Sequence, residues 1–307
     1  MLYNRQFLLV VFSAFVLQSM AQNVDFNDTI QSSSSTAHLE LHFNLPLGQL
    51  FVTGPSSKPG ISGIRCYSPN PGFQAKKTYR TLGARRIISF IPVEEQVGMA
   101  RQAASNSGEN SISYRISNTS LSDAGNVLWE YFPDPNMPHS IFIQSGMGSS
   151  RLDLSGLKIT GLNVSSGASD VIISYSKPNL TEMDVFEVNG GMGKIVVRNL
   201  EMARAKKVHI QNGLGETQIS IGSSCTIGTE ITVEVGAGSC TITADSDVPM
   251  KIIISKSFMS SIHIPESFLQ TGENIYVNPK YKTSENQSVV IFADIGIGDF
   301  TFLPSGK

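Results

Sequence analysis

Apolar and polar positions along this chain alternate in a short pattern that recurs about eight times. Every second residue is apolar or small until a corner that usually reads Gly-x-Gly, and after one skipped position the alternation resumes. The clearest copy fills these positions with Val208, Ile210, Asn212, Leu214, Thr217, Ile219 and Ile221. Alternation with a period of two is typical of a β-strand, whose neighbouring side chains point to opposite faces. Each copy therefore predicts a strand, a bend and a second strand.

Seven further copies have the same arrangement. They comprise Leu41, Phe43, Leu47, Leu50, Val52; Ile141, Ser145, Met147, Leu152; Leu162, Val164, Ala168, Val171, Ile173; Phe186, Val188, Met192, Ile195, Val197; Ile231, Val233, Ala237, Cys240, Ile242; Ile253, Met259, Ile262, Ile264; and Ile291, Ala293, Ile297, Phe300, Phe302. From Met147 to Met259, successive corner residues lie 21 to 24 residues apart. A fixed period of this size is typical of a stacked array. Glycine corners also occur in antiparallel hairpins, so parallel and antiparallel pairing both remain open.

The parity of the apolar positions changes at the corner, from even to odd numbers in the copy around Gly213. Such a change needs an irregular backbone, and glycine tolerates the positive φ of a bulge or sharp bend. We assign the corner residue, such as Leu214, to the inward set together with its apolar neighbours. On that assignment, Leu214→Asp unfolds several coils, because each large inward side chain contributes about 1.5–3 kcal/mol.

One position of the repeat, between the second and third inward positions, is polar in all eight copies. We call this set the polar ladder: Asn44, Gln144, Ser165, Asn189, Gln211, Glu234, Lys256 and Asp294. Stacked coils lie about 4.8 Å apart, so these side chains are expected to be neighbours, with Glu234 and Lys256 paired. The set is interpreted first as a solvated face and second as a binding face.

The ends of the repeats and the segments between them define the expected domain organisation. Residues 1–21 resemble an export signal, with Arg5 before an apolar run and a small-residue site before Gln22. Residues 22–307 are then one solenoid domain, with a first repeat at 41–52 and main repeats at 141–302. Insertions are expected at 53–138, with short strands at 87–93, 112–116 and 127–132, and at 265–287.

Composition and charge exclude some functions. Removing the signal leaves 22 basic and 25 acidic residues, which does not suggest a nucleic-acid partner. No later stretch approaches the roughly 18 apolar residues of a membrane span. Three cysteines allow at most one intramolecular disulfide; a Cys225–Cys240 pair is left open, while the inward position of Cys240 favours a buried free thiol.

The sequence predicts no catalytic, metal or cofactor site. The corner after Gly213 lacks the third glycine and the helix of a phosphate-binding loop. Three of the five histidines, at 42, 209 and 263, fall at outward positions of different coils and have no metal-ligand spacing. The outward positions of the second strands include a single carboxylate, Asp153, where a polysaccharide-cleaving β-helix needs a cluster. We therefore expect a non-enzymatic protein and keep a polysaccharide-active enzyme as the least favoured alternative.

A cluster of five cations is the strongest charged feature. Lys76, Lys77, Arg80, Arg85 and Arg86 lie within eleven residues that contain no acid. Such a patch is able to bind an anionic envelope polymer or lipid headgroup, although a solvated basic loop is the commoner explanation.

Several segments resemble the toast-rack family of uncharacterised bacterial cell-envelope proteins. They include the run from Arg151 to Asp170, the segments at 177–179, 190–193 and 212–216, and the closing segments at 256–262 and 293–298. The chain is also distantly similar to the C-terminal module of LiaF-type envelope-stress regulators and to β-helical adhesins. The resemblance implies a right-handed β-helix in an envelope setting and implies no catalytic residues.

Repeats and signal together predict an exported, all-β β-solenoid in a bacterial periplasm or at the cell surface. We expect it to act as a scaffold or interaction protein for a protein or envelope-polymer partner. The alternative is an adhesin or carbohydrate-binding protein that uses the polar ladder or the basic cluster.

Overall fold

The computed structural model describes residues 24–31, 36–68, 75–92, 110–113, 127–223, 228–256, 259–281 and 288–305. Its elements in chain order are β1 (Val24–Gln31), β2 (His38–Thr53), β3 (Ile61–Tyr67), β4 (Ala75–Leu82), β5 (Arg85–Pro92), β6 (Asn110–Ser113), β7 (Leu128–Phe132), β8 (Pro138–Asp153), β9 (Lys158–Ser174), β10 (Val185–Arg198), the 3-10 turn η1 (Leu200–Ala203), β11 (Lys207–Ile221), β12 (Thr229–Asp245), β13 (Met250–Lys256), β14 (Ser260–His263), β15 (Leu269–Gly272), β16 (Ile275–Val277) and β17 (Val289–Ser305). The expected export signal lies outside the described residues.

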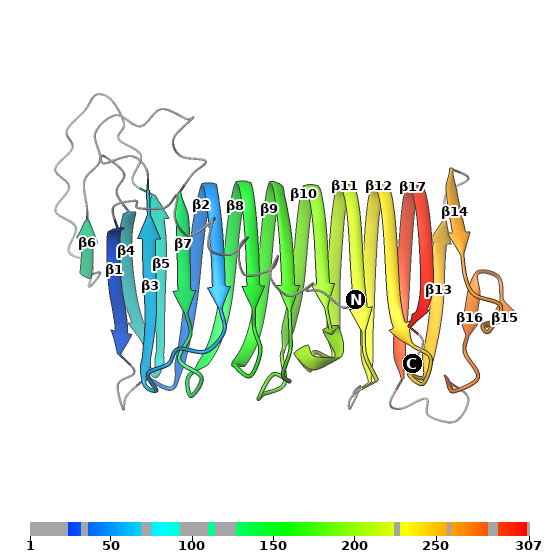
Figure 1. Ribbon diagram of the computed structural model, residues 1–307, viewed down its shortest axis with the longest axis horizontal. Coiled ribbons are helices and arrows are strands. Elements are labelled where there is room, and N and C mark those ends of the chain that lie inside the picture. The colour runs from blue at the N-terminus through cyan, green and yellow to red at the C-terminus, as the bar shows by residue number, and fades with distance from the viewer. Residues whose placement is uncertain are drawn as a thin grey trace, which may run out of the picture.

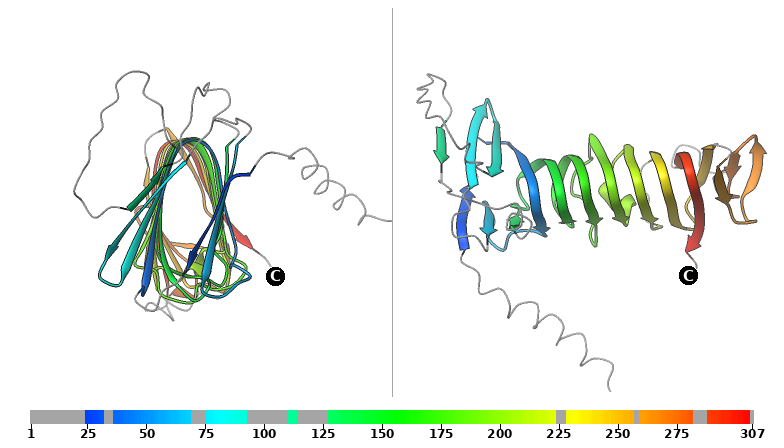
Figure 2. Two further views of the ribbon diagram at one scale, coloured as in Figure 1. Left: turned by 90° about the vertical axis from the view of Figure 1, so that its left-hand side faces the viewer. Right: turned by 90° about the horizontal axis from the view of Figure 1, so that it is seen from above.

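The strands stack into an elongated column (Figure 1). Each long strand bends once at its glycine corner, so an end view shows an arch whose two legs are the two halves of the strands (Figure 2). The apolar side chains that alternate along both halves are enclosed between these legs.

Successive long strands pair in parallel, with equivalent repeat positions opposite one another. Val188 of β10 faces Ile210 of β11, which faces Val233 of β12. The same register relates β2, β8, β9 and β10. The repeats therefore form a β-solenoid, as the sequence predicts, and the antiparallel alternative is wrong for them.

The change of parity at the corner is confirmed in β11. Ile210 before the corner is fully buried and Ile219 after it is 2% exposed. Asn212 and Thr217, the inward positions nearest the bend, are also buried. Inward positions thus end at 212 and resume at 217, and the intervening residues make the bend.

The corner residues do not belong to the core, contrary to the sequence prediction. Leu214 is 49% exposed, Met192 53% and Ile297 48%. The physical reason is the bend itself: alternation stops two residues before the corner residue, which then projects from the outside of the arch. The premise that Leu214→Asp unfolds several coils is wrong for the same reason.

The order of coils differs from the order of the chain at the C-terminal end. β17 lies between β12 and the pair β13 and β14, and it makes parallel bonds with all three. The expected insertion at 265–287 contains β15 and β16, which form an antiparallel hairpin on β13. The last strand of the chain thus occupies a coil inside the column.

The copy around Ile253 is shifted by one residue from the predicted register. Ile252 faces Ile291 of β17 and is fully buried, and Ile254 is 3% exposed, whereas Ile253 is only half-buried. Because residues 252–254 are all isoleucine, either the even-numbered or the odd-numbered residues could face the core. Pairing with β17 places the even-numbered residues inside.

The region expected as an insertion at 53–138 extends the column at its N-terminal end. β5 and β7 pair in parallel with the two halves of β2. β4 and β6 continue the first sheet in antiparallel fashion, and β3 and β1 continue the second. Trp129 of β7 is 1% exposed and anchors the core, as expected. The strands β1, β3 and β4 were not predicted.

The loops opposite the corners are held together by a buried asparagine. Asn179 is 1% exposed, and its Nδ2 donates to the carbonyl oxygens of Ile159 at 2.7 Å and Ala203 at 3.2 Å. The Ile159 amide donates to Asn179 Oδ1 at 2.8 Å. One carboxamide therefore satisfies buried backbone groups of β9 and η1, on either side of its own loop.

Candidate interaction surface

The corner residues form one continuous row, which we call the corner ridge, and all but the half-buried Leu47 and Ala237 are exposed. Its members in spatial order are Leu47, Met147, Ala168, Met192, Leu214, Ala237, Ile297 and Met259. Backbone pairing places each of the first six opposite the next. Met259 follows because its carbonyl oxygen accepts from the Gly298 amide at 3.2 Å. The row therefore runs along eight coils of the column.

The larger ridge side chains other than Leu47 are about half exposed. Met147 is 54% exposed and Met259 is 51% exposed, similar to Leu214. Sequence reasoning missed this exposure, although a signal was present. The corner position varies among methionine, leucine, isoleucine and alanine, whereas inward positions such as Ile210 and Val233 keep branched side chains that fill a core. Variation in size without loss of apolar character indicates a surface row.

The polar ladder is in register over seven of its eight members. Pairing runs from Asn44 through Gln144, Ser165, Asn189, Gln211 and Glu234 to Asp294. In the next coil, Asp294 faces Ser255, and Lys256 faces Ile295. The predicted pairing of Glu234 with Lys256 is wrong, because β17 separates β12 from β13.

A second polar row lies two residues beyond the corner, on the other side of the corner ridge. We call it the flanking row: Ser149, Asp170, Lys194, Glu216, Ser239, Asp299 and Ser261. Lys194 Nζ lies 2.9 Å from Glu216 Oε2, and the Lys194 amide donates to Asp170 Oδ1 at 2.9 Å. Lys194 beside Glu216 also holds the pKa of that carboxyl below its usual range.

The two rows beside the corner ridge are predominantly acidic toward its C-terminal end. Glu234 and Asp294 belong to the polar ladder, and Asp170, Glu216 and Asp299 belong to the flanking row. Among the described side chains of the two rows, Lys194 is the one cation. An apolar row thus runs between carboxylates.

The five predicted cations do not form a single patch. They lie on the hairpin of β4 and β5, where Lys77 faces Phe90 and Arg80 faces Ile87. Because neighbouring side chains of a strand alternate, Lys77 and Arg86 point between the two sheets, whereas Lys76, Arg80 and Arg85 point outward. Lys77 pairs with Asp28, and Arg85 Nη1 lies 3.2 Å from Glu40 Oε2. The assumed basic loop is a β-hairpin with cations on both faces.

Groups suited to metal or thiol chemistry are dispersed or enclosed. Across the described ranges, no group of three or more His, Cys, Asp and Glu side chains is placed to hold a metal ion. Cys240 is buried with a free thiol, as predicted, and burial raises its pKa to about 12. Cys66 is also buried, while Cys225 lies outside the described residues.

The described part of the chain contains no helix that is both long enough and apolar enough to cross a membrane. Its fold and surface define a parallel β-solenoid that carries rows of repeated side chains along its outside. The chain belongs to the toast-rack family: the family described as "N-terminal domain of toast_rack, DUF2154" matches residues 19–198. The predicted family is thereby confirmed.

Two solved structures are similar to the chain. One is a putative cell adhesion protein from Clostridium sporogenes, 14% identical, with a TM-score of 0.41 and coverage of 91% of this chain and 99% of that one. The other is a putative adhesin from Bacteroides fragilis, 9% identical, with a TM-score of 0.26 and coverage of 91% and 96%. No curated protein matches the sequence. The fold assignment rests on the strand register rather than on these two likenesses.

Proposed function

We propose that this chain is an exported, non-enzymatic interaction module of the bacterial cell envelope, and that it binds a partner protein along the corner ridge. The observation that carries the proposal is the continuous register of apolar corner residues over eight coils, of which all but the half-buried Leu47 and Ala237 are exposed. At about 4.8 Å per coil, seven steps span about 34 Å. Contiguous exposed apolar surface bordered by polar residues is typical of interaction sites.

The chemistry of the ridge favours a protein partner. Methionine side chains at Met147, Met192 and Met259 are flexible and adapt to irregular apolar surfaces. The carboxylates beside the ridge, including Glu234 and Asp294, repel an anionic lipid surface and favour a partner segment with basic residues next to apolar ones. The partner is therefore expected to present an apolar strip with flanking Lys or Arg.

Two further parts of the proposal have their own support. Export is supported by the signal-like pattern of residues 1–21. A non-enzymatic role is supported by the way the conspicuous polar groups are engaged: Glu216 pairs with Lys194, and His139 is enclosed in the core. Substrate-dependent turnover of an envelope polysaccharide by the purified protein would contradict the second part.

Site-specific photo-crosslinking in the native host tests the ridge. A photoreactive residue placed at Leu214 is expected to give an adduct of defined mass, and the adduct is expected to disappear when Met192→Glu is added. Leu180, 55% exposed in the loop that follows β9, supplies the matched position. Equal adducts at Leu180 and Leu214 would contradict the proposal, and an adduct of twice the chain mass would identify a second copy as the occupant.

A second experiment tests the role of the carboxylates beside the corner ridge. The double change Glu234→Gln and Asp294→Asn is expected to reduce the adduct at Leu214 at low salt, because it removes attraction for a basic partner. A matched change, Glu182→Gln with Asp247→Asn, removes two exposed carboxylates away from the ridge and is expected to leave the adduct unchanged.

The register of the polar ladder favours carbohydrate binding as a second candidate function. Five successive uncharged hydrogen-bonding side chains, from Asn44 to Gln211, repeat at the coil spacing. Gln144→Ala combined with Gln211→Ala is expected to abolish any signal on a glycan array if this candidate is correct. A glycan signal that survives both changes would remove the ladder from consideration.

A further inference from the structure

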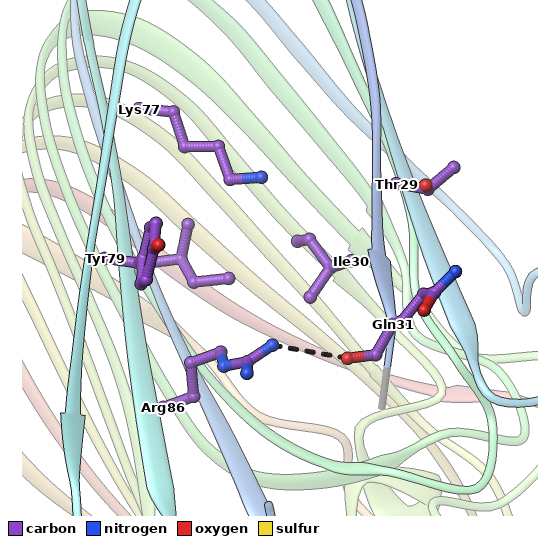
Figure 3. Close-up of a pocket in the computed structure, with 7 residues that line it drawn as sticks. Thr29, Ile30, Gln31, Lys77, Tyr79 and Arg86 are labelled. Atoms are coloured by element: carbon purple, nitrogen blue, oxygen red, sulfur yellow. Dashed lines mark hydrogen bonds between the residues drawn. The ribbon is translucent and has the colours of Figure 1, made fainter. Parts of the chain in front are cut away.

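A small cavity lies at the N-terminal end of the column, where the two sheets are extended by different strands. Its volume is about 200 Å³. β1 contributes residues 29–31, β4 contributes Lys77 and Tyr79, and β5 contributes Arg86 and Ile88 (Figure 3). The cavity therefore opens between the strands that end the first sheet and the strand that ends the second.

One part of the cavity wall is apolar. Ile88 is 1% exposed and Ile30 is 5% exposed, and the ring of Tyr79 packs against the core beside them. These three side chains present a surface that fits a compact hydrocarbon or an aromatic ring.

The opposite part of the wall carries unbalanced positive charge. Lys77 Nζ donates to Asp28 Oδ2, so this cation has a carboxylate partner. Arg86 Nη1 donates to the backbone carbonyl oxygen of Gln31 at 3.3 Å, and no carboxylate among the described residues pairs with this guanidinium. Arg86 Nε is buried and has no hydrogen-bond partner among the described residues. A buried donor without an acceptor is costly, and an acceptor supplied by a ligand removes that cost.

We propose that this cavity binds a small organic anion, whose carboxylate or phosphate group meets Arg86 and whose apolar body lies on Ile30, Ile88 and Tyr79. The planar guanidinium donates in a fork that matches two oxygens of such a group. Lys77 adds little net attraction, because Asp28 already neutralises its charge. The binding is independent of the corner ridge, which lies on the outside of the arch.

The hairpin offers matched controls on its outer face. On β4, Lys76 and Arg80 lie on the opposite face of the strand from the cavity-lining Lys77 and Tyr79. On β5, Arg85 likewise lies on the opposite face from Arg86. Removing an outward cation changes the net charge by the same amount as removing Arg86 but leaves the cavity wall intact. Comparing the two variants therefore separates long-range electrostatic attraction of the ligand from its direct contact with Arg86.

Ligand-observed NMR with benzoate, phenyl phosphate and the neutral benzyl alcohol tests the proposal on the mature chain. An ion pair with a small apolar contact is expected to give a Kd on the order of 1 mM. Arg86→Gln, which retains a donor for the Gln31 carbonyl, is expected to weaken binding of the anion at least tenfold. Arg80→Gln is expected to leave the Kd within twofold.

The outcomes are distinct. Binding of benzoate alone identifies a carboxylate ligand, and binding of phenyl phosphate alone identifies a phosphate ester. Either result supports the site if Arg86→Gln weakens the binding at least tenfold. Equal weakening by Arg80→Gln and Arg86→Gln, or binding of neither anion to the unaltered chain, overturns it. If Arg86→Gln does not fold, Ile88→Phe, which fills the cavity and keeps both cations, is expected to abolish binding, and unchanged binding to that variant overturns the proposal.

Discussion

A carbon atom added at Cα of Gly215 would lie 2.0 Å from the carbonyl oxygen of Gly193 in the neighbouring coil. Gly215 also has a φ of +141°, a conformation that residues with a side chain rarely adopt. The same relationship recurs one coil further on, where a carbon at Gly238 would lie 1.9 Å from the Gly215 oxygen. Close stacking of the corners at Gly215 and Gly238 thus depends on glycine, whereas the coils of β9 and β14 carry Ser169 and Ser260 at this position, without a positive φ.

Gly215→Ala is therefore expected to lower the free energy of unfolding by about 2–4 kcal/mol, through backbone strain and the clash with the next coil. Gly83→Ala is the control, because Gly83 has a φ of +59° with no atom within 4 Å of an added carbon. Its expected cost is about 1 kcal/mol. Urea denaturation followed by circular dichroism measures both, and equal losses would contradict the stacking argument.

Two substitutions in β11 distinguish the core from the corner ridge. Leu214→Asp is expected to cost less than about 1 kcal/mol, since a half-exposed carboxylate stays hydrated. Ile210→Asp is expected to cost more than about 4 kcal/mol, because it places a charge in a fully buried position. Thermal melts of the two variants provide the measurement. A large loss for Leu214→Asp would restore the original assignment of the corner residues to the core.

The loops opposite the corners depend on one side chain. Asn179→Ala is expected to destabilise the fold by about 3 kcal/mol, because buried backbone groups of Ile159 and Ala203 lose their partner. The control is Asn163→Ala, which removes a carboxamide that binds Glu187 Oε2 at 2.9 Å on the half-buried outer face. Its expected cost is below about 1 kcal/mol, and denaturant midpoints that fall equally for both variants would refute the assignment.

Acid is expected to weaken the fold through His139. Burial lowers the pKa of His139 from 6.5 to about 4, so the unfolded chain binds the proton more readily than the folded chain. Stability is therefore full above pH 6.5 and falls as the pH decreases toward 4, by about 3 kcal/mol in all. Burial and the neighbouring Arg85 also lower the pKa of His38, which adds a loss of the same sign.

Urea midpoints at pH 7.5, 6.0 and 5.0 measure this dependence. His139→Phe is expected to flatten most of it while retaining an aromatic contact with Tyr131, whose ring centroid lies 6.1 Å from that of His139. His209→Gln, on the outer face of β11, is expected to leave the slope unchanged. A slope that is identical in unaltered protein and His139→Phe would assign the acid sensitivity to other groups.

The buried thiols are expected to be inert in the folded chain. With Cys225→Ser, Cys66 and Cys240 remain, and both are fully buried. At pH 8, a pKa of about 12 leaves about one Cys240 thiol in ten thousand ionised. A thiol-reactive dye is therefore expected to label the variant only after urea unfolds it. Rapid labelling of two thiols in the folded variant would contradict the burial of these cysteines.

Much of the solenoid is predictable because its information is local and repeated. Alternation such as Val208, Ile210 and then Ile219 fixes which side of each strand is apolar, and glycine pairs mark the bends. The polar ladder was identified by the same reasoning, and its register holds over seven members. These features depend only on residues within one repeat.

The candidate surfaces were less predictable because they depend on geometry at the bend and on contacts between distant segments. The alternation that places Asn212 inside also placed Leu214 inside, although the bend turns Leu214 outward. The cations at 76–86 looked like one patch because the sequence gives no pairing partner for β4. Its antiparallel pairing with β5 and the approach of β1 separate Lys77 and Arg86 from the others.

The sequence by itself determined that this protein is a stack of bent strands, because each repeat carries its own alternation and its own glycine bend. Tertiary structure decided the order of the coils, since β17 is held between β12 and β13 by backbone hydrogen bonds that have no sequence signature. It also decided which polar side chains meet: Glu234 lies opposite Asp294 and not Lys256. Backbone pairing is nearly independent of side-chain identity, so several orders suit the same repeats, and only packing of the whole column selects one.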